Sequence, residues 1–196
     1  MNEDKTQMKG WQAWLIVGVL VLIGGFLFIR DRGGELAAVS RVSRSQVKFA
    51  SVPLPSNIIV LGTNSLSRFK ATADKKKDAE LFSFPFTITN KGASLSDLEL
   101  YAFTDAGFSD PAPGAATPAG LVASRPGGVA PGVSRITLTA SSTPAGLLGI
   151  PAGAARYFDL RGLILGNPPG AKVTTKFDGL SGQTITVPKR IQKPPK

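Results

Sequence analysis

The sequence predicts a mainly β protein: an antiparallel β-sandwich with one N-terminal transmembrane α-helix. Three observations lead to this fold class. Residues 11–29 form an uncharged apolar run near the start of the 196-residue chain. From about residue 57 onward, apolar and polar residues alternate in short runs, the period of a strand with one buried face. The chain also contains 22 glycines and 15 prolines, which favours many turns between short strands over a helical bundle.

The apolar run is WQAWLIVGVLVLIGGFLFI, with Gln12 as its one polar side chain. As a helix it spans roughly 28 Å, close to the hydrocarbon thickness of a bilayer. Trp11 and Trp14 suit the membrane interface, and Lys9 and Arg30 flank the run. We therefore expect a transmembrane helix at residues 11–30, after a short tail at 1–10. The side chains assigned to the membrane anchor are Trp11, Trp14, Leu15, Ile16, Val17, Leu20, Leu22, Ile23, Phe26, Phe28 and Ile29.

The apolar run is longer than the core of a usual signal peptide. The nearest small-residue cleavage pattern, Ala38-Val39-Ser40, lies about ten residues too far along the chain. We therefore expect a retained single-pass anchor in the cell membrane. The short N-terminal tail favours a domain outside the cytoplasm with the N-terminus inside, whereas a count of the basic flanking residues favours the opposite orientation.

Residues 31–56 are expected to form a stalk. Gly33-Gly34 interrupts the helix, and Pro53 and Pro55 favour extended backbone. The β-sandwich domain is expected to follow at residues 57–188.

The clearest strand of that domain runs from Ala79 to Asn90. Its alternating apolar side chains are assigned to the core: Phe82, Phe84, Phe86 and Ile88. Other strands are expected at Leu66–Ala73, Asp97–Thr104, Ser134–Ala140, Ala155–Leu165, Ala171–Asp178 and Thr184–Val187. About eight short strands separated by turn residues indicate a sandwich of immunoglobulin-like type.

Two segments of the domain differ from this pattern. Residues 105–132 are about two-thirds Gly, Ala and Pro, and we expect them to form a long flexible loop. Residues 189–196 are expected to form a basic C-terminal tail.

The chain contains no cysteine and no histidine. These absences exclude disulfides, thiolate nucleophiles, imidazole bases and the common zinc ligand sets. We therefore expect no enzymatic activity, no cofactor and no metal site.

The net charge is +10, with basic residues concentrated at Lys75–Lys77 and in the tail. Because they are not interleaved with exposed aromatic residues, nucleic-acid binding is not expected.

Two sets of carboxylates are candidate sites. Asp105 and Asp110 flank a glycine and could offer oxygens to calcium, but a calcium loop usually carries more carboxylates, which favours an acidic turn. Asp159 and Asp178 could meet across strands, but surface pairing with a basic neighbour is favoured, the candidates being Arg156, Arg161 and Lys176.

Three phrases together resemble a known family: LSRFKATAD at 66–74, LELY at 98–101 and IPAGAARYFDLRG at 150–162. They are similar to the immunoglobulin-like β-sandwich surface modules of membrane-anchored proteins in candidate-phyla-radiation (Patescibacteria-type) bacteria. The resemblance covers roughly residues 64–188. It implies an extracellular module behind a membrane or export segment, and it implies no catalytic or metal-binding residues.

We therefore expect a non-enzymatic surface protein that displays a β-sandwich for structural or adhesion-like interaction. Its expected partners are the lipid bilayer and a protein or glycan on the cell surface. Two alternatives stay open. In a pilin-like filament subunit the hydrophobic helix would lie in the fibre core; Lys9-Gly10 resembles a prepilin cleavage point, although Leu15 replaces the usual glutamate. A glycan- or cell-wall-binding module would need exposed aromatic residues, for which only Tyr101, Tyr157 and a few phenylalanines are candidates.

Overall fold

The computed structural model describes residues 46–115, 120–141, 143 and 146–188. The chain divides into residues 1–37 and 38–196, and every described residue belongs to the second unit. The described part is mainly β and contains no helix. Its strands are β1 (Val47–Val52), β2 (Gly62–Ala73), β3 (Ala79–Leu81), β4 (Ser83–Lys91), β5 (Ser94–Phe103), β6 (Leu121–Val129), β7 (Gly132–Thr139), β8 (Leu148–Ile150), β9 (Ala155–Gly166), β10 (Lys172–Phe177) and β11 (Gln183–Thr186).

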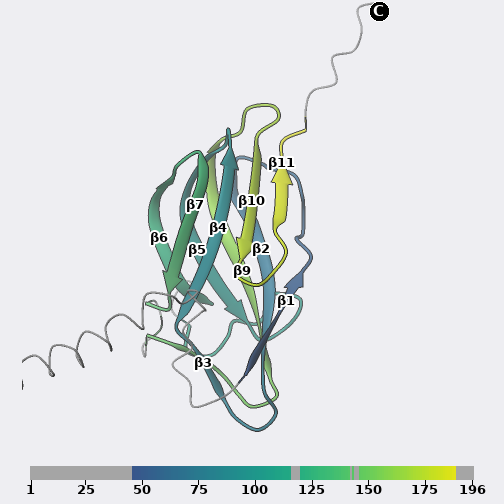
Figure 1. Cartoon of the computed structure of the whole chain (residues 1–196), viewed down its shortest axis with the longest axis vertical. Coiled ribbons are helices and arrows are strands. Elements are labelled where there is room, and N and C mark those ends of the chain that lie inside the picture. Colours follow the sequence, from purple (N-terminus) through teal and green to yellow (C-terminus); the bar gives the residue numbers. More distant parts are fainter. Residues whose placement is uncertain (1–45, 116–119, 142, 144–145, 189–196) are drawn as a thin grey trace, which may run out of the picture. The chain divides into compact units, whose positions relative to one another are not determined.

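All strand pairs in the sheets are antiparallel. A five-stranded sheet has the order β1-β2-β9-β5-β6, a four-stranded sheet has the order β11-β10-β4-β7, and β3 pairs with β8. In Figure 1 the four-stranded sheet lies in front of the strands of the larger sheet. The prediction of a mainly β, antiparallel domain is therefore confirmed.

One aromatic stack joins the two large sheets. Phe69 of β2 stacks on its cross-strand neighbour Phe158 of β9, with ring centroids 4.8 Å apart and planes 8° from parallel. Phe177 of β10, in the other sheet, stacks on Phe69 at 4.3 Å. All three side chains are buried. Such contacts add roughly 0.5–1.5 kcal/mol per pair beyond area burial, so this stack is one of the main links between the sheets.

The strand predicted at Ala79–Asn90 is two strands. Phe84, Phe86 and Ile88 of β4 are buried, as expected, but Phe82 is 45% exposed, so its assignment to the core is wrong. Leu81, three residues before Phe84, is buried as well, which means that the inward side of the chain changes between them. The change occurs because β3 pairs with β8, whereas β4 pairs with β7 and β10.

The predicted stalk at residues 31–56 extends too far. Residues 47–52 form β1, which pairs along its whole length with β2. Phe49 of β1 lies 5.1 Å from Phe177, ring centroid to centroid, and so contributes to the core. The domain therefore includes Val47 and does not begin at residue 57. The missed signal is the alternation of Val47 and Phe49 with polar neighbours.

The predicted loop at 105–132 contains a strand, β6, at the edge of the five-stranded sheet. Its first residues, Leu121 to Ala123, are buried and pair with β5. The Gly- and Pro-rich remainder is tolerated because an edge strand leaves one row of backbone donors unpaired. Gly127, at a positive φ of 94°, donates its backbone N–H to Asp97 Oδ1 at 2.8 Å. The high content of Gly, Ala and Pro in residues 105–132 predicts a loop and gives no sign of this strand.

The other expected strands lie near their predicted bounds as β2, β5, β7, β9, β10 and β11. The predicted N-terminal tail, transmembrane helix and C-terminal tail fall outside the described residues. Within the described ranges, no helix is long and apolar enough to cross a bilayer.

Candidate functional site

The outer face of the five-stranded sheet carries a cluster of polar and aromatic side chains that is separate from the main hydrophobic core. Alternation along β9 turns Tyr157, Asp159 and Arg161 outward, because Phe158 and Leu160 face the core. Their partners on β5 are Phe103, Tyr101 and Glu99, in that order. On β2, Arg68 lies opposite Asp159. The sheet register therefore places charged and aromatic side chains of three strands side by side.

Asp159 is the centre of this cluster and is only 1% exposed. Its Oδ2 accepts hydrogen bonds from Arg68 Nη2 at 3.2 Å and from Arg161 Nε at 3.0 Å. Its Oδ1 accepts the hydroxyl proton of Ser65. A buried carboxylate is tolerated only when it is paired and hydrogen-bonded, and both oxygens meet that requirement here.

Both guanidinium groups also lie over aromatic rings. Arg161 Cζ lies 4.3 Å from the ring centroid of Tyr101, and Arg68 Cζ lies 4.0 Å from that of Phe108. A cation over an aromatic face gains roughly 0.5–1 kcal/mol at an exposed site and more when desolvated. The arginines are thus held on one side by a carboxylate and on the other by a ring.

Phe108 reaches the cluster from the turn between β5 and β6. Its ring contacts Phe103 at 5.6 Å and Tyr157 at 6.0 Å between centroids. Phe108 has φ 58°, an uncommon value for a residue with a side chain. Asp105 holds the turn, because its carboxylate accepts the backbone N–H groups of Gly107, Ser109 and Asp110 and the Ser109 hydroxyl; the distances lie between 2.8 and 3.0 Å.

These hydrogen bonds give Asp105 a structural role in the turn. The backbone N–H groups, that of Asp110 above all, lower the pKa of Asp105. Both carboxylate oxygens already serve the turn, and Asp110 Oδ2 accepts the hydroxyl proton of Thr104. Among the described residues, no three acidic side chains gather into a cluster that could hold a metal ion. The acidic-turn interpretation of Asp105 and Asp110 therefore accounts for this segment.

Tyr101 is not the exposed aromatic platform that a sugar-binding module would need. It is buried, and the Arg161 guanidinium covers its ring. Its hydroxyl donates to Glu99 Oε2 at 2.8 Å. Burial, followed by this hydrogen bond, raises the pKa of Tyr101 to about 12, so the phenol keeps its proton at neutral pH. Tyr157 is half-buried against Phe108. Neither tyrosine therefore provides the exposed aromatic side chain that the glycan-binding alternative needs.

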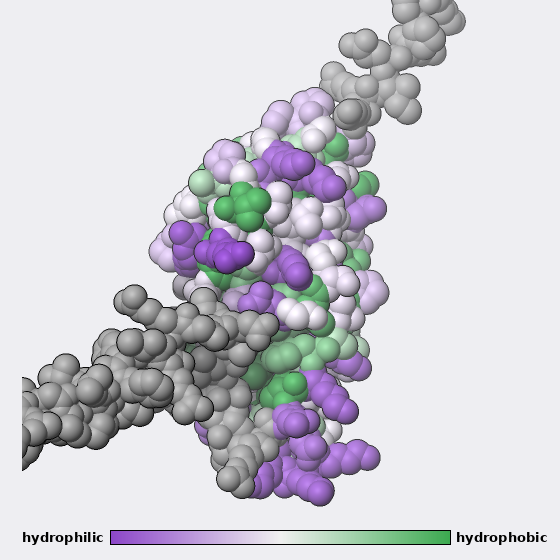
Figure 2. All heavy atoms as spheres, in the orientation of Figure 1, coloured by the Kyte–Doolittle hydropathy of each residue, from purple (hydrophilic) through white to green (hydrophobic). Residues whose placement is uncertain are grey.

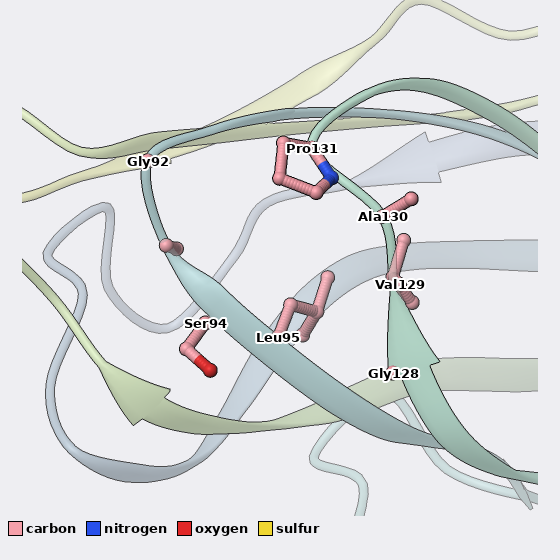
Figure 3. A pocket seen from close by; sticks show the side chains of 8 residues that line it. Gly92, Ser94, Leu95, Gly128, Val129, Ala130 and Pro131 are labelled. Atoms are coloured by element: carbon pink, nitrogen blue, oxygen red, sulfur yellow. The ribbon is translucent and has the colours of Figure 1, made fainter.

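A second feature is a shallow hollow of about 530 Å³ between β5 and β6. Figure 3 shows Leu95 and Val129 on the two strands, with Pro131 beyond the end of β6. Asn90 holds the backbone nearby by donating to the carbonyl oxygens of Ala93 and Val129. The lining residues are small or apolar and carry no charge, so the hollow offers little to orient a polar ligand.

Sequence reasoning identified part of the Asp159 cluster. Asp159 pairs with Arg161, one of its three expected partners, and Asp178 takes no part in the cluster. The expectation that this pairing lies on the surface is wrong, because Asp159 is buried. Arg68 was missed because it lies 91 residues from Asp159, and only the β2–β9 register brings the two together. The anchor residues Trp11 to Ile29 lie outside the described residues.

No protein-family model matches the sequence. A search of curated proteins likewise finds no significant match. The cluster is therefore interpreted from its own geometry.

Proposed function

We propose that the chain is a non-enzymatic, single-pass membrane protein that displays an immunoglobulin-like β-sandwich for structural or adhesion-like interaction. The observation that carries the proposal is the small number of residues between the apolar run and the folded domain in the sequence. The uncharged apolar run ends at Ile29, and β1 of the folded domain begins at Val47. A short connection of this kind suits a domain displayed close to a bilayer surface.

The sandwich architecture is supported by the shared core. Two antiparallel sheets bury one face each, and Phe49, Phe69 and Phe177 connect them. The chain has no cysteine, so the domain lacks the disulfide that joins the two sheets of antibody domains.

The non-enzymatic role is supported by the chemistry of the Asp159 cluster. Asp159 uses both carboxylate oxygens to hold Ser65 and two arginines, and Tyr101 keeps its proton at neutral pH. Arg68 and Arg161, which are partly exposed, are therefore the groups that the cluster presents to a partner. The chain contains neither a histidine nor a cysteine to supply a base or a thiolate.

Thiol labelling tests the topology, because the chain has no native cysteine. Asp178→Cys places one thiol at the exposed β10–β11 turn, and Asp4→Cys places one in the N-terminal tail. In intact cells, a membrane-impermeant maleimide should label the Asp178→Cys variant, whereas the Asp4→Cys variant should react only after lysis. The reverse pattern would place the domain in the cytoplasm and overturn the display role.

Membrane retention is tested separately. Leu20→Arg with Leu22→Arg should release the protein into the soluble fraction, since each arginine costs about 2.5–3.5 kcal/mol at the centre of a membrane helix. The matched control, Leu20→Ile with Leu22→Ile, should stay in the membrane pellet after alkaline extraction. Wild-type protein that dissolves without detergent would overturn the anchor. A mature N-terminus at Trp11, read by mass spectrometry, would instead support the pilin-like alternative.

A further inference from the structure

The outer face of the four-stranded sheet has an unusual composition. Because β4, β7, β10 and β11 turn Phe84, Ile136, Val173 and Ile185 inward, their alternate residues face solvent. We call this surface the basic threonine face; its residues are Lys91, Arg135, Lys172 and Lys176 together with Thr87, Thr89, Thr137, Thr139, Thr174, Thr184 and Thr186. Figure 2 views the molecule from the side of this sheet and shows purple hydrophilic residues among near-white ones, with a few green hydrophobic residues.

Every charged residue of these four strands is basic. Lys91, Arg135, Lys172 and Lys176 are all exposed, and none forms an ion pair with another described residue. Lys172 lies directly opposite Lys91 in the β10–β4 register. Like charges at such positions destabilise a sheet, and a bound anion would remove that cost.

Threonine hydroxyls fill the positions between the cations. Thr87 lies between Lys176 on β10 and Arg135 on β7, and Thr89 lies between Thr174 and Val133 in the next row. The Thr174 and Thr184 hydroxyl oxygens are 2.9 Å apart and share a hydrogen bond. A hydroxyl both donates and accepts, so this face can bind hydroxyl groups as well as anions.

The positive charge continues beyond the sheet. Thr186 of β11 is paired with Lys172, and the sequence that follows adds Lys189, Arg190, Lys193 and Lys196 without an acidic residue. The face and the segment after it thus carry eight basic residues and no acidic one. Charge of one sign on the sheet face concentrates anionic partners.

We propose that the basic threonine face binds a linear anionic polysaccharide, whose acid groups meet the lysines and arginine and whose hydroxyls meet the threonines. This inference rests on the interaction role proposed above and names the chemistry of the partner, but it does not depend on the orientation in the membrane. Charge complementarity selects the anionic polymer over a neutral glycan.

Two other anionic partners fit this face less well. Nucleic-acid bases stack on exposed aromatic rings, but Phe84, Phe86 and Phe177 of this sheet all point into the core. A bilayer surface is usually engaged through apolar side chains as well as charges. Among the large apolar residues of these strands, only Val133 is strongly exposed, at 69%.

The test uses the full-length chain in nanodiscs of neutral phosphatidylcholine. Polygalacturonate is the probe, and dextran of similar length is the neutral control. Wild-type protein should bind polygalacturonate at low salt, release it as salt rises, and leave dextran unbound. Lys172→Glu with Lys176→Glu should weaken binding more than about tenfold, because two attractive charges become repulsive.

The matched control makes the same change of net charge on the other sheet. Lys48→Glu with Arg125→Glu alters exposed residues of β1 and β6 and should retain nearly wild-type affinity. Circular dichroism melts of both double variants check that each is folded. Arg135→Glu provides a second, independent variant of the face and should also weaken binding.

Four results would overturn the inference. They are no binding of polygalacturonate at low salt, equal losses in the two double variants, preference for duplex DNA or phosphatidylglycerol vesicles over the polymer, and loss of binding only when Lys189, Arg190, Lys193 and Lys196 are changed to Gln. The labelling experiment tests membrane display separately, so failure of the one proposal is distinguishable from failure of the other.

Discussion

Arg68 and Asp159 lie opposite each other in the β2–β9 pair, and Arg68 Nη2 is 3.2 Å from Asp159 Oδ2. The carboxylate is buried, whereas the Arg68 side chain is 18% exposed and that of Arg161 is 31% exposed. The arginines can thus keep part of their hydration while the aspartate cannot. Asp159 is therefore the member of the cluster that most needs its partners.

Asp159→Asn should destabilise the domain by about 2 kcal/mol. This is less than the roughly 3–5 kcal/mol for a fully buried pair, because the guanidinium groups are partly exposed. The amide would lose the charge that pairs with both guanidinium groups, and only one of its two polar atoms could still accept a hydrogen bond. Urea unfolding of the full-length protein in detergent, followed by circular dichroism, measures the change. Asp178→Asn, at an exposed turn, should leave the midpoint unchanged; equal midpoints for both variants would contradict the role of Asp159.

Ionisation of the Tyr101 phenol should lower the stability of the folded domain in alkaline solution. Burial and the Glu99 hydrogen bond raise its pKa to about 12, whereas an unfolded tyrosine titrates near 10. The folded state binds the proton more tightly, so this contribution is complete below about pH 10 and is lost as pH rises toward about 12. Its size is on the order of 2 kcal/mol. Urea unfolding at a series of pH values measures the loss.

Tyr101→Phe supplies the control for this pH effect. The variant lacks the phenol and should lose less stability between neutral and alkaline pH than the wild type does. The Tyr157→Phe variant leaves Tyr101 as the one tyrosine of the chain. If ultraviolet absorbance of this folded variant showed Tyr101 ionising near pH 10, the shift of Tyr101 would be disproved.

Asp105 should control the local order of the turn that carries Phe108. Asp105→Ala removes the acceptor for the backbone N–H groups of Gly107, Ser109 and Asp110, and their hydrogen exchange should become several-fold faster. The lowered pKa of Asp105 means that the wild-type turn keeps these bonds as pH falls, until the pH passes through that lowered value.

Asp78→Ala is the matched control for the turn. Asp78 likewise accepts a backbone N–H, that of Ala152, but in a different connection of the chain. Exchange at residues 107–110 should be unaffected in this variant. Unchanged exchange in Asp105→Ala would show that other contacts hold the turn.

The parts of the fold that follow from local alternation could be predicted from the sequence. The inward positions of Phe84, Phe86 and Ile88 are of this kind, as are the outward positions of Asp159 and Arg161. The exposed position of Phe82 could not be predicted, because the chain passes from β3 to β4 at this residue. That change of sheet depends on the pairing of β3 with β8, which local alternation does not reveal. The register that brings Arg68 to Asp159 includes a bulge between Ser65 and Ser67, and a one-residue change there would turn Arg68 to the other face.

The fold should not tolerate a larger side chain at Gly162. A Cβ at this position of β9 would lie 2.7 Å from Cδ1 of both Leu66 and Leu95, and both leucines are buried. Two core side chains would have to move, so Gly162→Ala should cost about 1–3 kcal/mol, measured by urea unfolding. Gly149→Ala is the matched control: Gly149 is also in a strand, a Cβ added there would meet no atom within 4 Å, and the change should alter stability by less than about 1 kcal/mol. If the two alanine variants unfolded at the same urea concentration, the close packing of β9 against Leu66 and Leu95 would be wrong.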